Sequence, residues 1–317
     1  MSRTLFIVDG EATAGTIRAS GLAKAKELLC WRDALYTGPV PAGLSFRQLS
    51  RLRSRFWTRG KSATEFDYRD AALNACKDSE SIALWFAPNC VLCQMSLSQV
   101  LSWCREHRVP ASRLSWVALH GGELHDSQVA AAYAKCRPVT AAQMSLAVTV
   151  WRAFRQPKPA DIMKLTRQLP KLIPGLKESL LRLLQEYPSQ RNGLSRLEKL
   201  LLMTIRSKGS ITAATAASAI FSKETVGDLL LFDMLRDFVR ASHPLLEFAE
   251  PFSGNIGNRH FHSAVLRLTG FGKRVLAGKA DHVTANGIDR WIGGVHLRGQ
   301  SVRWRWDTIE KRIVSTD

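Results

Sequence analysis

Apolar and polar positions alternate in blocks along the first 140 residues. Short, nearly continuous apolar runs predict buried strands at 4–8, 27–31, 81–86 and 114–119, and each run ends at polar or glycine residues. Stretches with helical spacing lie between them, near 12–26, 45–57, 67–78, 92–106 and 127–136. Strands that alternate with helices predict an α/β domain over residues 1–140, with a Rossmann-like parallel sheet covered by helices on both faces.

The rest of the chain divides into two predicted parts. Residues 141–193 have a helical pattern interrupted by prolines, which predicts a basic helical connector. Three helices are predicted next, the first of them opened by the capping box Ser195-x-x-Glu198, and two strands follow near 243–248 and 264–268. Three helices followed by a β-hairpin predict a winged-helix-like domain over residues 194–317.

Near the end of the chain, arginine and tryptophan alternate from Arg303 to Trp306. Period-two alternation predicts a strand with one cationic and one aromatic face. The aromatic face could stack on a nucleobase. We favour the other interpretation, in which the tryptophans cover the core while the arginines face water.

Polar residues follow the predicted strands of the first domain. The carboxyl ends of parallel strands meet at one edge of the sheet, where ligands bind in such folds. The expected ligand-binding residues are Asp9, Gly10, Glu11, Arg32, Asp33, Asn89 and His120. The turn at Gly10 and Gly15 could present backbone N–H groups to an anion, although it matches neither the dinucleotide fingerprint nor the P-loop.

The net charge of the chain points to a kind of partner that the pattern of apolar and polar residues does not. The chain has 45 Lys and Arg against 27 Asp and Glu, a net charge of +18. Residues 151–200 alone carry 11 basic and 4 acidic side chains. The expected nucleic-acid contacts are Arg51, Arg53, Arg55, Arg59, Lys61, Arg152, Arg155, Lys164, Arg167 and Lys171. A basic field of this size attracts polyanions, so the sequence predicts a nucleic acid or another polyanion as partner.

The third predicted helix of the winged-helix-like domain argues against groove reading. It carries Asp228, Asp233 and Asp237, with Glu224 just before it. Phosphates repel these carboxylates, so packing or contact with a protein partner is the more natural use of this helix.

Cysteine spacing raises the question of a metal. Cys90-x2-Cys93 and Cys104-x2-His107 resemble a zinc pattern. On one helix, however, Cys93 and Cys104 would lie about 16 Å apart, too far for one ion, so we predict reduced thiols and no metal.

The N-terminus shows no secretory signal and no apolar run reaches the length of a membrane span, which predicts a cytoplasmic protein without a membrane partner.

Three segments carry a family resemblance: residues 31–41 (WRDALYTGPVP), 187–195 (YPSQRNGLS) and 286–297 (NGIDRWIGGVHL). Together they resemble a bacterial family catalogued as domain of unknown function 1835 with a paired C-terminal domain. The resemblance implies a cytoplasmic protein with a Rossmann-like N-terminal half, and it implies no activity or cofactor. The family's first turn reads Gly-Asp-Ser where this chain has Gly10-Glu11-Ala12, and its Glu-His-Asp after the third strand is Ala87-Pro88-Asn89-Cys90 here. If those acids are catalytic or bind metal in relatives, this chain is altered or inactive.

Three functions follow as hypotheses. The first is a non-enzymatic, nucleic-acid-associated protein, motivated by the two basic segments. The second is an enzyme or nucleotide-binding protein with its site at the strand ends. No nucleophile-plus-base spacing assigns it a reaction. The third is an assembly partner that binds another protein through its winged-helix-like domain.

Overall fold

The computed structural model describes the chain except residues 1–3, 59–63, 77–79, 119–124, 222 and 317. The chain forms two compact units. The first comprises Met1–Leu181 and Trp291–His296, and the second comprises Arg182–Arg290 and Leu297–Asp317. The main division thus falls inside the predicted connector, within helix α8.

The first unit is built on a five-stranded, mostly parallel sheet with the order β2-β1-β3-β4-β5. Its strands are β1 (Thr4–Val8), β2 (Leu28–Cys30), β3 (Ser81–Trp85), β4 (Leu114–Val117) and β5 (Arg137–Pro138). Neighbouring strands run parallel except β5, which pairs antiparallel with β4. The mixed α/β class and the parallel sheet expected from the apolar runs are therefore confirmed.

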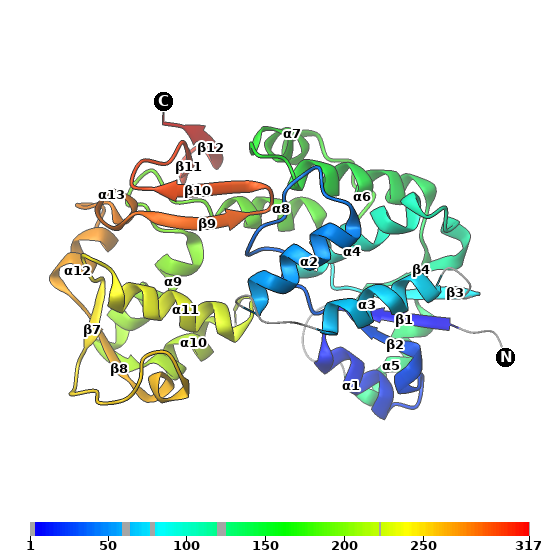
Figure 1. Cartoon of the computed structure of the whole chain (residues 1–317), viewed down its shortest axis with the longest axis horizontal. Coiled ribbons are helices and arrows are strands. Elements are labelled where there is room, and N and C mark those ends of the chain that lie inside the picture. The colour runs from blue at the N-terminus through cyan, green and yellow to red at the C-terminus, as the bar shows by residue number, and fades with distance from the viewer. Residues whose placement is uncertain (1–3, 59–63, 77–79, 119–124, 222, 317) are drawn as a thin grey trace. The chain divides into compact units, whose positions relative to one another are not determined.

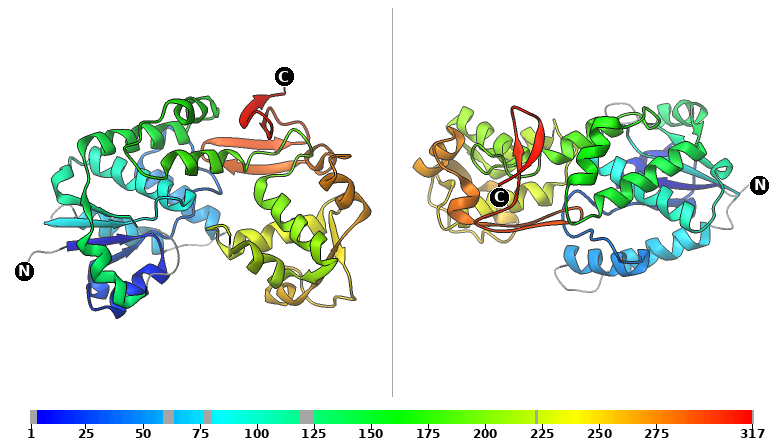
Figure 2. Two further views of the ribbon diagram at one scale, coloured as in Figure 1. Left: turned by 180° about the vertical axis from the view of Figure 1, so that it is seen from behind. Right: turned by 90° about the horizontal axis from the view of Figure 1, so that it is seen from above.

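Helices cover both faces of this sheet. Residues Phe6, Val8 and Trp85 point toward α1 and α5 and form one apolar cluster with Ile17 and Val129. Figure 1 shows α1 and α5 on this side and α4 with α6 on the other, and the left view of Figure 2 shows the same layers from behind. The helices of the unit are α1 (Glu11–Ala19), α2 (Phe46–Trp57), α3 (Thr64–Ala75), α4 (Val91–Glu106), α5 (Asp126–Ala134), α6 (Ala141–Phe154), α7 (Ala160–Gln168) and the first part of α8 (Leu176–Leu184).

The second unit combines helices with a three-stranded antiparallel sheet of order β6-β8-β7. Its core contains Leu201, Leu235 and Leu266, all fully buried. The elements are α9 (Arg196–Lys208), β6 (Ser210–Thr212), α10 (Ala213–Phe221), α11 (Asp228–Arg240), β7 (Leu246–Phe248), β8 (Val265–Leu268), α12 (Gly270–Leu276) and α13 (His282–Asn286). The predicted capping box opens α9: the Ser195 hydroxyl accepts from the Glu198 N–H, and the Glu198 carboxylate accepts from the Ser195 N–H.

Two hairpins end the chain. Strands β9 (Ile288–Ile292) and β10 (Val295–Gly299) pair, as do β11 (Trp304–Asp307) and β12 (Arg312–Ser315). The expected division into buried tryptophans and exposed arginines is only partly right. Trp306 is buried, but Arg305 is buried as well, because its guanidinium donates to the Asp281 carboxylate at 2.7 Å.

Candidate functional site

The end of β1 lies where the chain order of the sheet reverses, with β2 on one side of β1 and β3 on the other. Such a switch point is where ligands bind in open α/β sheets. Asp9 follows β1, and its carboxylate accepts hydrogen bonds from the Thr13 hydroxyl at 2.6 Å and the Cys93 thiol at 3.4 Å. Gly10 then begins α1 in an extended conformation, without a side-chain cap on the helix.

Glu11 and Arg32 meet at the same edge of the sheet. The Arg32 guanidinium donates to the Glu11 carboxylate at 2.6 Å, and both side chains are about half exposed. A hydrogen bond from the Cys30 thiol, followed by the one from Arg32, lowers the pKa of Glu11. Burial and the contact with Glu11 raise the pKa of Cys30 to about 12, so this thiol stays protonated at neutral pH.

A cavity of about 540 Å³ opens beside this ion pair. Glu11 and Arg32 line it together with Arg18 from the last turn of α1 and Phe66 from α3. The cavity is large enough for a small organic ligand. Its arginines favour a ligand that carries negative charge.

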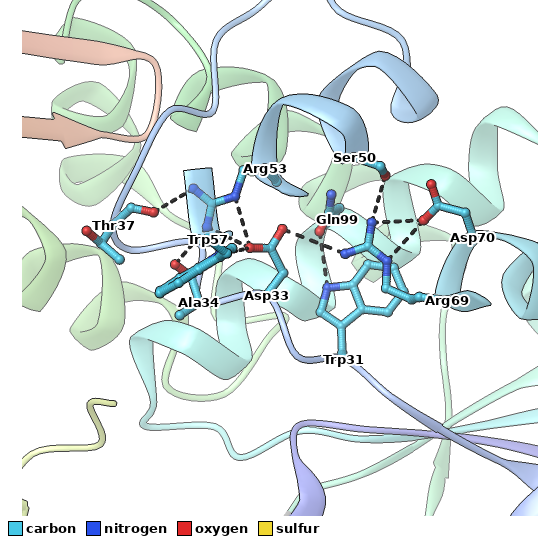
Figure 3. Close-up of polar contacts among 10 residues, drawn as sticks. All are labelled: Trp31, Asp33, Ala34, Thr37, Ser50, Arg53, Trp57, Arg69, Asp70 and Gln99. Atoms are coloured by element: carbon cyan, nitrogen blue, oxygen red, sulfur yellow. Dashed lines mark hydrogen bonds and ion pairs between the residues drawn. The ribbon is translucent and has the colours of Figure 1, made fainter. Parts of the chain in front are cut away.

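Asp33 has a different environment from its neighbour Arg32. It is fully buried, and one carboxylate oxygen accepts from Arg53 Nε at 2.9 Å, from Arg53 Nη2 at 2.6 Å and from the Trp57 indole at 3.1 Å (Figure 3). Arg53 also donates to the backbone carbonyl of Thr37 at 2.6 Å. Asp33 therefore cannot contact a ligand in the cavity; it is the counter-ion that fixes α2 to the loop after β2.

Arg69 is the member of this network that the sequence analysis missed. It lies on α3, and its Nη1 faces the second oxygen of Asp33 at 3.7 Å while Nη2 donates to the Ser50 hydroxyl at 2.7 Å. Its guanidinium also lies 4.6 Å from the centre of the Trp31 ring. No local pattern marks this residue, since its partners Trp31, Asp33 and Ser50 come from other segments of the chain.

The balance of charges sets the ionisation of Asp33. Burial by itself raises the pKa of this carboxyl, but attraction and hydrogen bonds from Arg53, with further attraction from Arg69, lower the pKa below its usual value. Asp33 is therefore ionised at neutral pH. Arg69 also pairs with the Asp70 carboxylate at 2.9 Å, so the cluster holds two cations and two carboxylates.

The other predicted ligand residues do not all join one site. Asn89 is exposed in the loop between β3 and α4. No described hydrogen bond connects it to Asp9, Glu11 or Arg32. His120 lies outside the described residues. The structure thus brings Glu11 and Arg32 to one cavity, places Asp9 against Cys93, and separates Asp33 from both.

The arginines of α2 differ in exposure according to the face of the helix on which they lie. Arg53 faces inward and is fully buried, so it cannot contact a polyanion. Arg51 and Arg55 are exposed, and Arg47 is exposed one turn earlier. Arg59 and Lys61 lie outside the described residues. The spacing of four places Arg47, Arg51 and Arg55 along one face of α2, about 6 Å apart by helical rise.

This exposed stripe carries no local countercharge. The α2 sequence, FRQLSRLRSRFW, has no acidic residue. Within the part of the chain that the structure describes, Arg47, Arg51 and Arg55 form no ion pair. Three guanidinium groups therefore face solvent with their full donor capacity.

The second basic segment contributes a comparable surface. Arg152, Lys164, Arg167 and Lys171 are exposed on and beyond α6 and α7. Arg155 differs, because its guanidinium donates to the backbone carbonyls of residues 41 and 44 at 2.7 to 3.0 Å. These bonds tie the end of α6 to the loop that leads into α2, so both basic segments belong to one unit.

The cysteine and histidine pattern does not form one metal site. Cys93 and Cys104 lie eleven residues apart on α4, and the ring of His107 stacks on Trp103 at 4.1 Å. Among the described residues, no group of three His, Cys, Asp or Glu side chains is placed to hold a metal ion.

In the part of the chain that the structure describes, no helix is both long and apolar enough to cross a lipid bilayer.

No protein-family model, no curated protein and no solved structure matches the chain.

Proposed function

We propose that the chain is a non-enzymatic, nucleic-acid-associated protein that binds the phosphate backbone through the exposed faces of α2, α6 and α7. The observation that carries this proposal is the stripe of Arg47, Arg51 and Arg55, which has no acidic partner in the described residues. A spacing near 6 Å along the helix is comparable to the spacing of successive phosphates in one strand. The net charge of +18 supplies the long-range attraction.

Buried arginines support phosphate binding because they hold the exposed arginine stripe of α2 in place. Arg53 lies on the opposite face of α2 from Arg51, and it anchors the helix to Asp33 and to the Thr37 carbonyl. Arg155 anchors the preceding loop. Anchored helices lose little conformational freedom on binding, which favours contact with an extended anion.

The finer fold assignments belong to the same proposal. The strand order, with helices on both faces, supports a Rossmann-like first unit. The order α9, α10, α11 followed by β7 and β8 supports a winged-helix-like second unit. Membership of the family with domain of unknown function 1835, and a place in the cytoplasm, remain proposals that rest on the three sequence segments given above.

A mobility-shift titration with DNA and RNA across salt concentrations tests the proposal. The variant Arg47→Ala/Arg51→Ala/Arg55→Ala should bind more weakly and should lower the slope of log K against log salt by about one for each arginine lost. The matched control is Arg206→Ala/Lys208→Ala/Lys273→Ala, which removes the same charge from exposed positions of the second unit. Absence of wild-type binding at 50 mM salt, or equal losses in both variants, would overturn the proposal.

A second candidate function rests on the cavity beside Glu11. We infer that a small phosphorylated ligand, such as a nucleotide, could displace the Glu11 carboxylate from Arg32 and approach the uncapped N-terminus of α1. Thermal-shift measurements with nucleotides test it. Stabilisation that is lost in Arg32→Ala supports the candidate, and no shift with any nucleotide contradicts it.

A further inference from the structure

The dithiol at the start of α4 is not used by the proposed function. Cys90 is the N-cap of α4 and Cys93 is its third residue, so the two thiols lie on the same helical turn. The Cys93 N–H donates to the Cys90 sulfur at 3.2 Å. This contact draws the Cys90 sulfur toward Cys93, the arrangement that allows a Cys-x-x-Cys pair at a helix N-terminus to close into a disulfide.

A carboxylate lies beside the second thiol. Asp9 Oδ2 accepts from the Cys93 thiol at 3.4 Å, while Asp9 Oδ1 is held by the Thr13 hydroxyl at 2.6 Å. Asp9 is part-exposed, so a proton that it takes from Cys93 can pass on to a departing hydroxide. The site therefore has two thiols and a proton acceptor within contact distance of one of them.

We propose that Cys90 and Cys93 are a redox-active dithiol that hydrogen peroxide closes to a disulfide, with Cys90 as the thiol oxidised first and Asp9 as the proton acceptor of Cys93. The residues are 3% and 1% exposed, which excludes docking of a folded protein disulfide. Hydrogen peroxide has only two heavy atoms, so burial selects it over larger oxidants.

The chemistry proceeds in two steps. The Cys90 thiolate attacks one oxygen of hydrogen peroxide, the O–O bond breaks, and the released hydroxide takes a proton from solvent to leave as water; Cys90 becomes a sulfenic acid. Cys93 then gives its proton to Asp9 and attacks the Cys90 sulfur. The S–O bond breaks, and the departing hydroxide takes the proton from Asp9 as a second water. Two thiols lose two electrons in total, and hydrogen peroxide gains them.

The two thiols differ in acidity in the direction that these roles require. The Cys93 thiol has one proton, which can donate to the Cys90 sulfur in place of Asp9; that hydrogen bond lowers the pKa of Cys90 despite burial, the Cys93 backbone N–H adds to this effect, and the Asp9 carboxylate opposes it. The same thiol contact, together with burial, raises the pKa of Cys93. Cys90 is thus the more easily ionised sulfur, and Cys93 needs an acceptor for its proton.

Peptide mapping of the full chain tests the proposal. After peroxide treatment and iodoacetamide alkylation under denaturing conditions, the tryptic peptide 78–105 should lose two hydrogens through a Cys90–Cys93 bond, with Cys104 alkylated in the same peptide. Cys104 is the internal control, because it is fully buried on the same helix. Alkylation of both Cys90 and Cys93 after peroxide, or a bond to Cys104 instead, would overturn the proposal.

Variants separate the roles of the three residues. Cys93→Ser should stop the reaction at a Cys90 sulfenic acid, which dimedone traps when the oxidised protein is unfolded in its presence. Asp9→Asn should form this sulfenic acid at least as fast as wild type, because the Asp9 carboxylate raises the pKa of Cys90. It should prolong the lifetime of the sulfenic acid about a hundred-fold or more, the contribution expected of a positioned base. Cys136→Ser, which changes a thiol outside the site, should behave as wild type. An unchanged lifetime in Asp9→Asn would remove Asp9 from the proposal, and untrapped Cys90 in Cys93→Ser would overturn it.

Discussion

At the scale of single residues, neighbours in the sequence have opposite roles in this protein. Arg51 and Arg53 are both arginines of α2, yet one is exposed and the other fully buried. Arg32 and Asp33 are adjacent, yet Arg32 lines a cavity and Asp33 is inaccessible. The side chain that lies on the inner face is the one that finds a buried partner of opposite charge.

Replacing the buried Arg53 should lower the unfolding free energy far more than replacing the exposed Arg51. Arg53→Ala leaves the Asp33 carboxylate buried and largely uncompensated, which costs about 3–5 kcal/mol of unfolding free energy. Arg51→Ala changes an exposed position and should stay within about 0.5 kcal/mol of wild type. Urea unfolding followed by tryptophan fluorescence measures both. Equal destabilisation of the two variants would show that Asp33 does not depend on Arg53.

Acid should weaken the same network. The folded pKa of Asp33 is lower than its unfolded value of about 3.9. Ionised Asp33 therefore adds stability above that pH, and the contribution is lost as pH falls through the folded pKa. The stability gap between wild type and Asp33→Asn should stay constant from pH 7 to about pH 5 and should narrow below about pH 4, as urea titrations down to about pH 3 would measure. A gap that stays constant at the acid end as well would contradict the assignment.

At the scale of elements, the strand-end loops are fixed by close backbone contacts. Gly175 has a φ of +73°, and a Cβ there would lie 2.2 Å from the carbonyl oxygen of Pro88, in the loop that precedes Cys90. Ser179 of α8 also donates to this oxygen at 3.4 Å. The start of α8 thus holds the loop between β3 and α4, which positions the dithiol.

A matched pair of glycine variants tests this contact. Gly175→Ala adds both left-handed backbone strain, about 1–2 kcal/mol, and a collision with backbone that cannot rotate away. Gly43→Ala has the same kind of strain, with φ of +80°, but open space around the new methyl group. Thermal unfolding should therefore show a larger loss for Gly175→Ala. Similar losses would mean that the Pro88 loop adapts at little cost.

At the scale of the whole molecule, the net charge of +18 is not spread evenly. Residues 201–250 carry 5 basic and 6 acidic side chains, and they include α11 with its aspartates. The exposed arginines of α2, which are Arg47, Arg51 and Arg55, and the basic residues of α6 and α7 are in the first unit. Charge distribution therefore favours the first unit as the nucleic-acid interface.

Ultraviolet crosslinking to a single-stranded nucleic acid, followed by mass spectrometry, reads out this preference in the full chain. Crosslinked peptides should come from residues 46–57 and 141–171, where phosphate contacts bring bases close. Peptides from 228–240 should be absent, because phosphates repel the carboxylates of α11. Crosslinks confined to α11 would instead identify the second unit as the binding surface.

Strand and helix positions of the first domain were predictable because burial imposes a period on the sequence. The run at 4–8 became β1 without change, and in the second unit the predicted capping box at Ser195 begins α9. Asp9, Glu11 and Arg32 were also predictable, since residues at strand ends meet at one edge. Arg69 was not, because nothing in its own segment distinguishes it from any other helical arginine.

The sequence by itself determined the α/β class, the order of the elements and the excess of positive charge, since each depends on local periodicity or on simple counting. Only the tertiary structure decided which charges are accessible. Whether an arginine is a surface cation or a buried anchor depends on a carboxylate that comes from another segment, as Asp33 does for Arg53 and Asp281 does for Arg305. The same holds for Cys93, whose thiol meets the Asp9 carboxylate only because the fold brings the end of β1 to the start of α4.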